Sequence, residues 1–110
     1  MRMDVVEKPD MFQVFVDLPG VAKEGIDINI ETNVGAPLLT VSASKELQPL
    51  DEGSWFLRQE RRSGRFQRAL RLPFNADTEH ATTCFANGVL CLCFPKHTTP
   101  QGGFKKLALA

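Results

Sequence analysis

The sequence has no excess of charge of either sign, no long apolar run and few cysteines. Its 110 residues contain 13 basic and 13 acidic side chains, so neither a nucleic acid nor a membrane surface is an expected partner. The apolar runs are too short to span a bilayer. Three cysteines behind no apolar N-terminal segment do not make the disulfide framework of a small secreted domain. These absences favour a reducing, cytoplasmic compartment.

The residue patterns of catalytic sites are also missing. The chain has no Gly-x-Ser-x-Gly elbow, no HExxH helix and no Gly-rich phosphate loop. The adjacent carboxylates Asp51 and Glu52 occur in a polar, turn-like segment, where solvated acids are common. We therefore predict that the protein is not an enzyme and uses no cofactor.

Three cysteines lie on either side of an Asn87-Gly88 pair. If this pair is a two-residue turn, Cys84 lies opposite Cys91, and Cys93 lies on the same face two residues further on. Zinc would need a fourth ligand, and neither histidine of the chain has the paired spacing of a zinc site. We predict no metal and interpret the cysteines as small hydrophobic strand residues, with redox sensitivity as the alternative.

Apolar and polar residues alternate through most of the chain, and a period of two is typical of half-buried strands. Residues 11–19 place Phe12, Val14, Val16 and Leu18 on one face. The same alternation recurs in residues 25–31, 38–44, 65–73, 82–86 and 89–95. Turn signals separate these segments, and no long window has the periodicity of an amphipathic helix. The pattern predicts an all-β fold, an antiparallel immunoglobulin-like β-sandwich of six or seven strands.

Two segments interrupt this alternation. Residues 45–63 make a long loop that is polar at its start and then contains strand-like SWFLRQ, with the only tryptophan. That piece either folds back on its own core or pairs with another chain. Residues 97–110 run through HTTPQGG to FKKLALA, which predicts a flexible extension with an apolar end. Residues 1–96 are then the folded domain.

Three motifs occur in order: VFVDLPGVAKEGIDINIE at 14–31, ERRSGRFQRALRLP at 60–73 and FANGVLCLCFPK at 85–96. Together they resemble the α-crystallin domain of small heat-shock proteins, most of all the plant, fungal and bacterial branch. The matching positions are Gly64, Phe66, Arg68, Leu70, Leu72, Pro73, Phe85, Asn87, Gly88, Val89, Leu90 and Pro95. Thr83 replaces the alanine of the family motif and Leu70 replaces an aromatic residue, which affects the shape of a groove rather than the fold. The apolar N-terminal arm of the family is expected to be missing or very short, because Met1 leads straight into the first strand.

The resemblance gives the apolar tail a binding site. Leu107-Ala108-Leu109 matches the C-terminal motif that, in the family, inserts into a groove on another subunit. Two leucines spaced i, i+2 on an extended segment point the same way and fill neighbouring pockets. The residues that the resemblance assigns to the groove are Ile26, Ile28, Ile30, Thr83 and Phe85.

The resemblance also implies a dimer in which SWFLRQ crosses to the first strand, DVVEK, of a partner. The implied interface residues are Trp55, Phe56, Leu57, Arg58, Arg68, Val5 and Val6. By alternation Arg68 shares a face with apolar side chains, so we expect a carboxylate or several carbonyls around its guanidinium group.

Six arginines fall close together in the sequence: Arg58, Arg61, Arg62, Arg65, Arg68 and Arg71. A nucleic-acid surface would also need interleaved aromatic residues for stacking and a basic domain, but the net charge is zero and Phe66 is needed by the core. The family resemblance implies instead an ATP-independent holdase that binds partly unfolded proteins and assembles with itself, as a homodimer or a higher oligomer. The alternative is an adaptor with the same sandwich, resembling the co-chaperone domains that dock on the ninety-kilodalton heat-shock chaperone.

Overall fold

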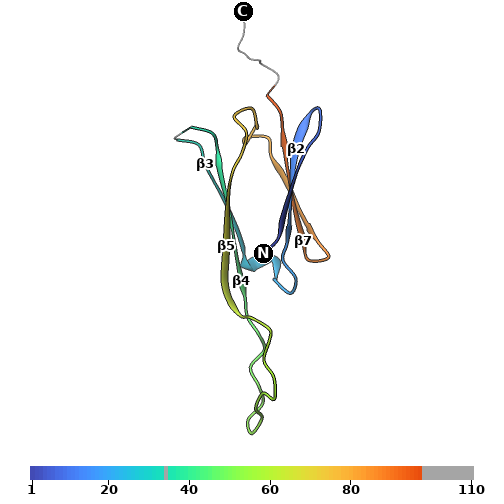
Figure 1. Cartoon of the computed structure of the whole chain (residues 1–110), viewed down its shortest axis with the longest axis vertical. Coiled ribbons are helices and arrows are strands. Elements are labelled where there is room, and N and C mark those ends of the chain that lie inside the picture. The colour runs from blue at the N-terminus through green and yellow to red at the C-terminus, as the bar shows by residue number, and fades with distance from the viewer. Residues whose placement is uncertain (34, 98–110) are drawn as a thin grey trace, which may run out of the picture.

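The structure is a computed structural model, and it describes residues 1–33 and 35–97. The elements are β1 (Met3–Glu7), β2 (Met11–Asp17), the 3-10 helix η1 (Lys23–Gly25), β3 (Ile26–Glu31), β4 (Leu38–Lys45), β5 (Gly64–Arg71), β6 (Thr82–Ala86) and β7 (Val89–Pro95). They form two antiparallel sheets, with strand orders β1-β2-β7-β6 and β3-β4-β5. The sheets face each other as two layers (Figure 1). The predicted all-β sandwich is confirmed.

The core lies between the two layers and follows the alternation of the sequence. The buried hydrophobic residues are Phe12, Val14, Val16, Leu18, Leu39, Val41, Ala43, Leu72, Ala76, Leu90, Leu92 and Phe94. Because side chains alternate between the faces of a strand, the polar residues between them face outward. Each fully buried Val, Leu or Phe contributes about 1.5–3 kcal/mol by leaving water.

The predicted hairpin at Asn87-Gly88 is present between β6 and β7. Both turn residues have positive φ angles, 55° at Asn87 and 75° at Gly88. A two-residue turn of this kind needs the left-handed region at both positions, which asparagine and glycine tolerate best. The turn fixes the register, so Cys84 lies opposite Cys91 as expected.

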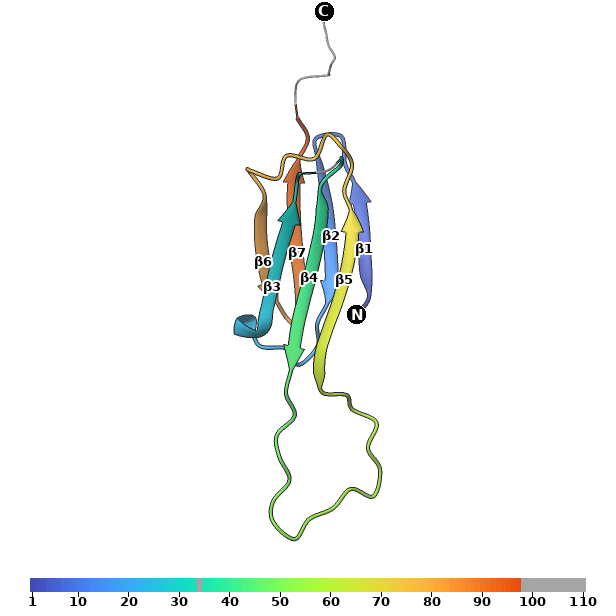
Figure 2. The same ribbon diagram turned by 90° about the vertical axis from the view of Figure 1, so that its left-hand side faces the viewer.

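The long loop between β4 and β5 leaves the sandwich altogether (Figure 2). Residues 54–59 form no strand within the single chain, so the strand-like composition of SWFLRQ is not realised there. Trp55 is 77% exposed and Leu57 is 97% exposed. The interpretation that this piece folds back on its own core is therefore wrong.

A pair of phenylalanines tests this description of the core. Phe94 is fully buried, whereas Phe74 is 78% exposed in the loop after β5. We expect Phe94→Ala to lower the free energy of unfolding by about 3–5 kcal/mol, because it leaves a cavity between the sheets. Phe74→Ala is the matched control and should change it by less than about 0.5 kcal/mol. Urea unfolding followed by circular dichroism measures both, and equal effects would contradict the assignment of the core.

Candidate functional site

The sandwich has two open sides, because each sheet ends in strands that the other sheet does not cover fully. On one side the edge strands β3 and β6 lie next to each other, and on the other side β5 lies next to β1 (Figure 2). An edge strand also presents N–H and C=O groups that have no ladder partner. Both sides are therefore places where a further strand could bind.

The side formed by β3 and β6 carries a groove of about 210 Å³, lined by both apolar and polar side chains. Four of the five predicted groove residues line it, namely Ile26, Ile28, Thr83 and Phe85. The two isoleucines lie opposite Ala43 and Val41 of β4, which are fully buried, but are themselves only half-buried. Apolar side chains on the inner face are thus left partly in contact with water.

The fifth predicted residue, Ile30, is not part of this groove. It packs against the core further along β3, because the groove is centred on the first half of that strand. Sequence reasoning missed Lys23, Cys84 and Leu90, which also line the groove. Cys84 could have been inferred from its place between Thr83 and Phe85, whereas Lys23 lies in η1, which strand periodicity does not describe.

On the opposite side of the sandwich, β1 and β5 leave inner-face residues exposed. Val5 lies opposite the fully buried Val14, yet 49% of its surface is exposed. Arg68 lies opposite the fully buried Val41 and is likewise exposed. The predicted apolar-side position of Arg68 is confirmed by this register, although the side chain reaches water in the single chain.

The guanidinium group of Arg68 binds a carbonyl rather than a carboxylate. Its Nη1 donates a hydrogen bond to the Met1 carbonyl oxygen at 2.9 Å. Within residues 1–33 and 35–97 no carboxylate lies within 4 Å of it. The expectation of several carbonyls or a carboxylate is therefore met in part, by one carbonyl near the start of β1.

Of the remaining predicted interface residues, four lie on the loop, away from the two open sides, and Val6 lies on β1. Phe56 is 51% exposed, and Arg58 pairs with Glu60 at 3.3 Å, both of these charged side chains facing solvent. Val6 of β1 is 39% exposed. Within one chain the structure does not bring the loop residues to β1, because the loop extends beyond the end of the sandwich (Figures 1 and 2).

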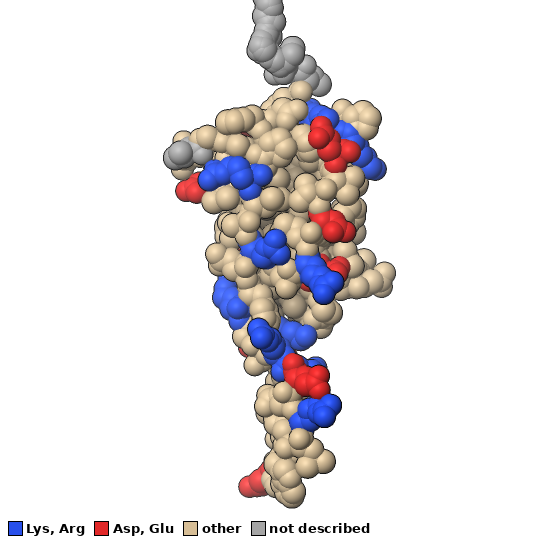
Figure 3. Space-filling model, viewed as in Figure 1, with Lys and Arg blue, Asp and Glu red and all other residues tan. Residues whose placement is uncertain are grey.

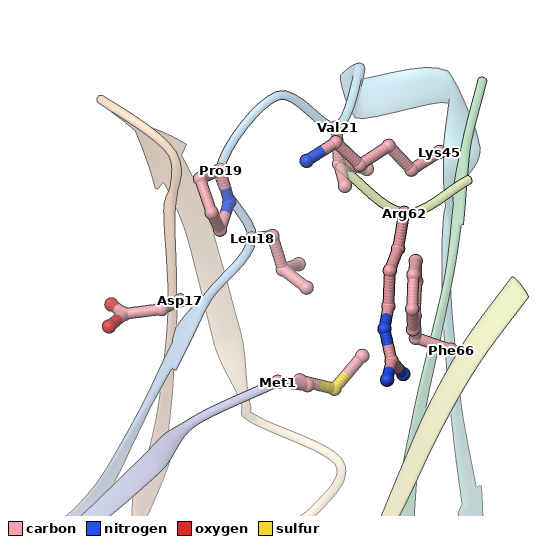
Figure 4. Close-up of a pocket in the computed structure, with 8 residues that line it drawn as sticks. All are labelled: Met1, Asp17, Leu18, Pro19, Val21, Lys45, Arg62 and Phe66. Atoms are coloured by element: carbon pink, nitrogen blue, oxygen red, sulfur yellow. The ribbon is translucent and has the colours of Figure 1, made fainter. Parts of the chain in front are cut away.

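A further apolar pocket, which the sequence did not predict, opens at the end of the sandwich from which the loop leaves. It has a volume of about 190 Å³, and Leu18, Val21 and Phe66 line it together with Met1 (Figure 4). Arg62 of the loop lies alongside the ring of Phe66. Alternation places Leu18 and Phe66 on inner faces, but it cannot show that the layers stay open at this end.

On the face drawn in Figure 3, basic residues lie among acidic ones, and neither sign of charge occurs alone. Arg65 pairs with Asp27 at 2.9 Å and donates to the Ser44 hydroxyl, and Lys96 pairs with Glu7 at 2.8 Å. Exposed pairs of this kind contribute little to stability, but they neutralise charge locally. In the described part of the chain, no group of three or more His, Cys, Asp or Glu side chains is placed so that it could hold a metal ion. No helix in these ranges is long and apolar enough to cross a membrane.

Comparison with known proteins identifies the fold. A sequence profile described as the Hsp20/alpha crystallin family matches residues 4–107. The chain belongs to this family. Its relatives include small heat shock protein C4 of Rickettsia felis, 35% identical over 99% of this chain and 63% of that protein. A 17.7 kDa class II heat shock protein of Arabidopsis thaliana is 37% identical over 89% of this chain and 62% of that protein. The chain thus spans less than two thirds of the length of these relatives.

Solved structures of Hsp20/alpha crystallin proteins have the same sandwich. Heat shock protein 16.0 from Schizosaccharomyces pombe superimposes with a TM-score of 0.77 at 30% identity, covering 99% of this chain and 82% of that chain. A small heat-shock protein from Xylella fastidiosa, described as having a distinct high order structure, gives 0.76 at 27% identity, covering 97% and 94%. The suspected membership in the small heat-shock family is confirmed. Proteins of this family are chaperones, not enzymes.

Leu107 and Leu109, the predicted assembly motif, lie outside the described residues.

Proposed function

We propose that this chain is an ATP-independent holdase that binds partly unfolded proteins and prevents their aggregation. In this proposal two chains form a dimer by exchanging residues 54–59, and the Leu107 and Leu109 tail of one subunit occupies the groove of another. Partners are further copies of the chain and unfolded clients, and the cytoplasmic location stays a prediction. Residues 1–96 are the assembling domain and residues 97–110 its extension.

The observation that carries this proposal is the amount of apolar side chain left on the outside of a well-packed sandwich. Trp55 and Leu57 are almost fully exposed, and Val5 lies half-exposed on an inner face. Trp55, Phe56 and Leu57 are consecutive, and a contiguous exposed apolar segment on a soluble domain marks a site of protein binding. The groove between β3 and β6, with a volume of about 210 Å³, adds a second site, where Ile26, Ile28 and Phe85 are accessible.

The geometry supports competition as the mechanism. An edge groove binds an extended segment whose alternate side chains are apolar, and both the tail and an unfolded client provide such a segment. Two leucines contribute about 3–6 kcal/mol on burial, and ordering a loose tail offsets much of that. A single tail contact is then weak, whereas several contacts in one assembly hold by avidity. Heating shifts the population towards free grooves, which capture clients.

Mixing the full chain with a heat-labile globular enzyme tests the holdase activity. We expect light scattering from the heated enzyme to fall as the chain is added, with no further change on adding ATP, because the chain only covers apolar surface. Serum albumin at the same mass concentration serves as the control for non-specific protection. Unchanged scattering at every ratio would show that this chain alone is not a holdase.

The same samples separate the holdase from the adaptor. An adaptor with this sandwich would leave client aggregation unchanged and would instead bind the ninety-kilodalton heat-shock chaperone. The apolar surfaces on both sides of the sandwich favour the holdase, because an adaptor needs only one docking face.

A further inference from the structure

Three thiols gather on the outer face of the four-stranded sheet, and the proposed function assigns no chemistry to them. Cys91 and Cys93 lie on β7, with their sulfur atoms 3.9 Å apart. Cys84 lies on β6 directly opposite Cys91 in the register, and Cys84 is exposed. The Gln13 side-chain amide donates to the Cys93 sulfur at 3.6 Å. All three are free thiols.

The closest pair of sulfur atoms is not the pair that bonds most easily. Cys91 and Cys93 are two residues apart in an extended strand, so their Cα and Cβ atoms are separated by roughly 6.7 Å. A disulfide needs Cβ atoms about 3.5–4.5 Å apart, so this bridge would bend β7. That strand is flanked by β2 and β6 and contributes Leu92 and Phe94 to the core, which resists such bending.

The pair formed by Cys84 and Cys91 is better placed. Residues directly opposite each other on antiparallel strands have Cβ atoms about 4.5–5.5 Å apart, so a shift of about 1 Å suffices. That shift falls on β6, which is an edge strand with a ladder partner only in β7. Cys84 is the accessible thiol, whereas Cys91 is half-buried. Burial, and a hydrogen bond with Cys93, raise the pKa of the Cys91 thiol, which favours Cys84 as the thiol that reacts first.

We propose that Cys84 and Cys91 form a peroxide-reactive dithiol site that closes to a cross-strand disulfide. The Cys84 thiolate attacks one oxygen of hydrogen peroxide, the O–O bond breaks and one water leaves, which gives a sulfenic acid. The Cys91 sulfur then attacks the Cys84 sulfur, the S–O bond breaks and the second water leaves. Two thiols are oxidised by two electrons in total, and one peroxide is reduced to two waters.

The bridge also affects the groove between β3 and β6, because Cys84 lies between Thr83 and Phe85 on the strand that forms one groove wall. A covalent link from β6 to β7 reduces the opening of this edge strand. The bridge itself requires no chaperone activity, so this inference stands or falls independently of the proposed function.

Peptide mapping of the full chain tests the pairing directly. The chain is treated with hydrogen peroxide, free thiols are alkylated, and trypsin then releases residues 72–96, which contain all three cysteines. Hydroxylamine cleaves the Asn87-Gly88 bond and separates Cys84 from the other two. We expect the two pieces to remain linked until a reductant is added, in the unmodified chain and in Cys93→Ser. Cys84→Ser leaves no thiol in residues 72–87 and is the blank, whereas Cys91→Ser should give at least about ten-fold less linked product.

Other outcomes overturn the proposal. The two pieces could separate, with the mass of residues 88–96 lower by two hydrogen atoms. That result would show a bridge between Cys91 and Cys93. Disulfides between two chains, or an unchanged number of free thiols after peroxide treatment, would also contradict the proposal. Either result would show that the alignment of β6 with β7 does not determine which thiols are oxidised. Hydrogen exchange provides the second measurement, because oxidation should slow exchange of the β6 amides in Cys93→Ser and not in Cys84→Ser. Equal exchange in the bridged and reduced forms would exclude an effect on the groove wall.

Discussion

Replacing Trp55 and Leu57 together by alanine is expected to convert the dimer into monomers. The two side chains are spaced i, i+2, so in an extended segment they point the same way and would cover one strip of the partner subunit. Both are almost fully exposed in the single chain, at 77% and 97%. Truncating an interface anchor typically costs about 2 kcal/mol or more, and each substitution occurs twice in an exchanged dimer, so dimerisation should weaken by at least about a thousand-fold.

Sedimentation equilibrium over a range of protein concentrations measures this change. Leu50→Ala is the matched control, because Leu50 lies in the same loop, is 46% exposed and falls outside residues 54–59. The free energy of unfolding of the double variant, compared at a concentration where both proteins are monomeric, should be unchanged, since neither side chain packs on the core. A dimer that survives the double substitution would rule out exchange through this segment.

The strands and the core were predictable because each strand has one face between the layers. The alternation of Phe12, Val14 and Val16 is a direct consequence of that geometry, and the same holds for Leu90, Leu92 and Phe94 on the neighbouring β7. The hairpin at Asn87-Gly88 was predictable for a local reason, since both turn residues need positive φ angles.

Other features depend on contacts that the sequence does not encode locally. Residues 54–59 have the composition of a strand, yet a strand forms only where a neighbour supplies hydrogen bonds, and the single chain offers none beside the loop. Arg68 has the register of an inner-face residue, but the open side between β1 and β5 leaves it exposed. The way the two layers diverge at their ends places Lys23 of η1 beside the groove. The same divergence opens the pocket lined by Met1 and Phe66.

Four of the predicted groove residues line one pocket for a reason that can be stated physically. Ile26, Ile28, Thr83 and Phe85 occupy inner-face positions on edge strands, where one side of each residue has no covering layer. The alternation of the sequence predicts which side chains face the core. The family resemblance adds that β3 and β6, which belong to different sheets, lie next to each other and form one groove. Ile30 has the same periodicity but lies beyond this pocket, because the pocket is shorter than β3.

Removing the leucines of the tail is expected to have the second large effect, a fall in assembly mass to that of the dimer. Leu107→Ala with Leu109→Ala removes about 3–6 kcal/mol of apolar burial per tail before ordering costs, which leaves too little to hold an extended segment in an edge groove. Light scattering of the full chain measures the mass. A variant with Leu107→Ala and Ala108→Leu keeps the composition but points the two leucines in opposite directions, so it should also fail to assemble.

The groove offers the complementary test, because two neighbouring threonines face opposite ways. Thr83 lines the groove, whereas Thr82 lies opposite Cys93 on the outer face, and both are exposed. We expect Thr83→Arg to lower the mass as the tail variants do, because a long cationic side chain occupies the site of a leucine. Thr82→Arg adds the same charge to the same strand and should leave the mass unchanged. If the two arginine variants behave alike, or if the tail variants keep the full mass, then assembly does not depend on this groove, and the tail must have another partner.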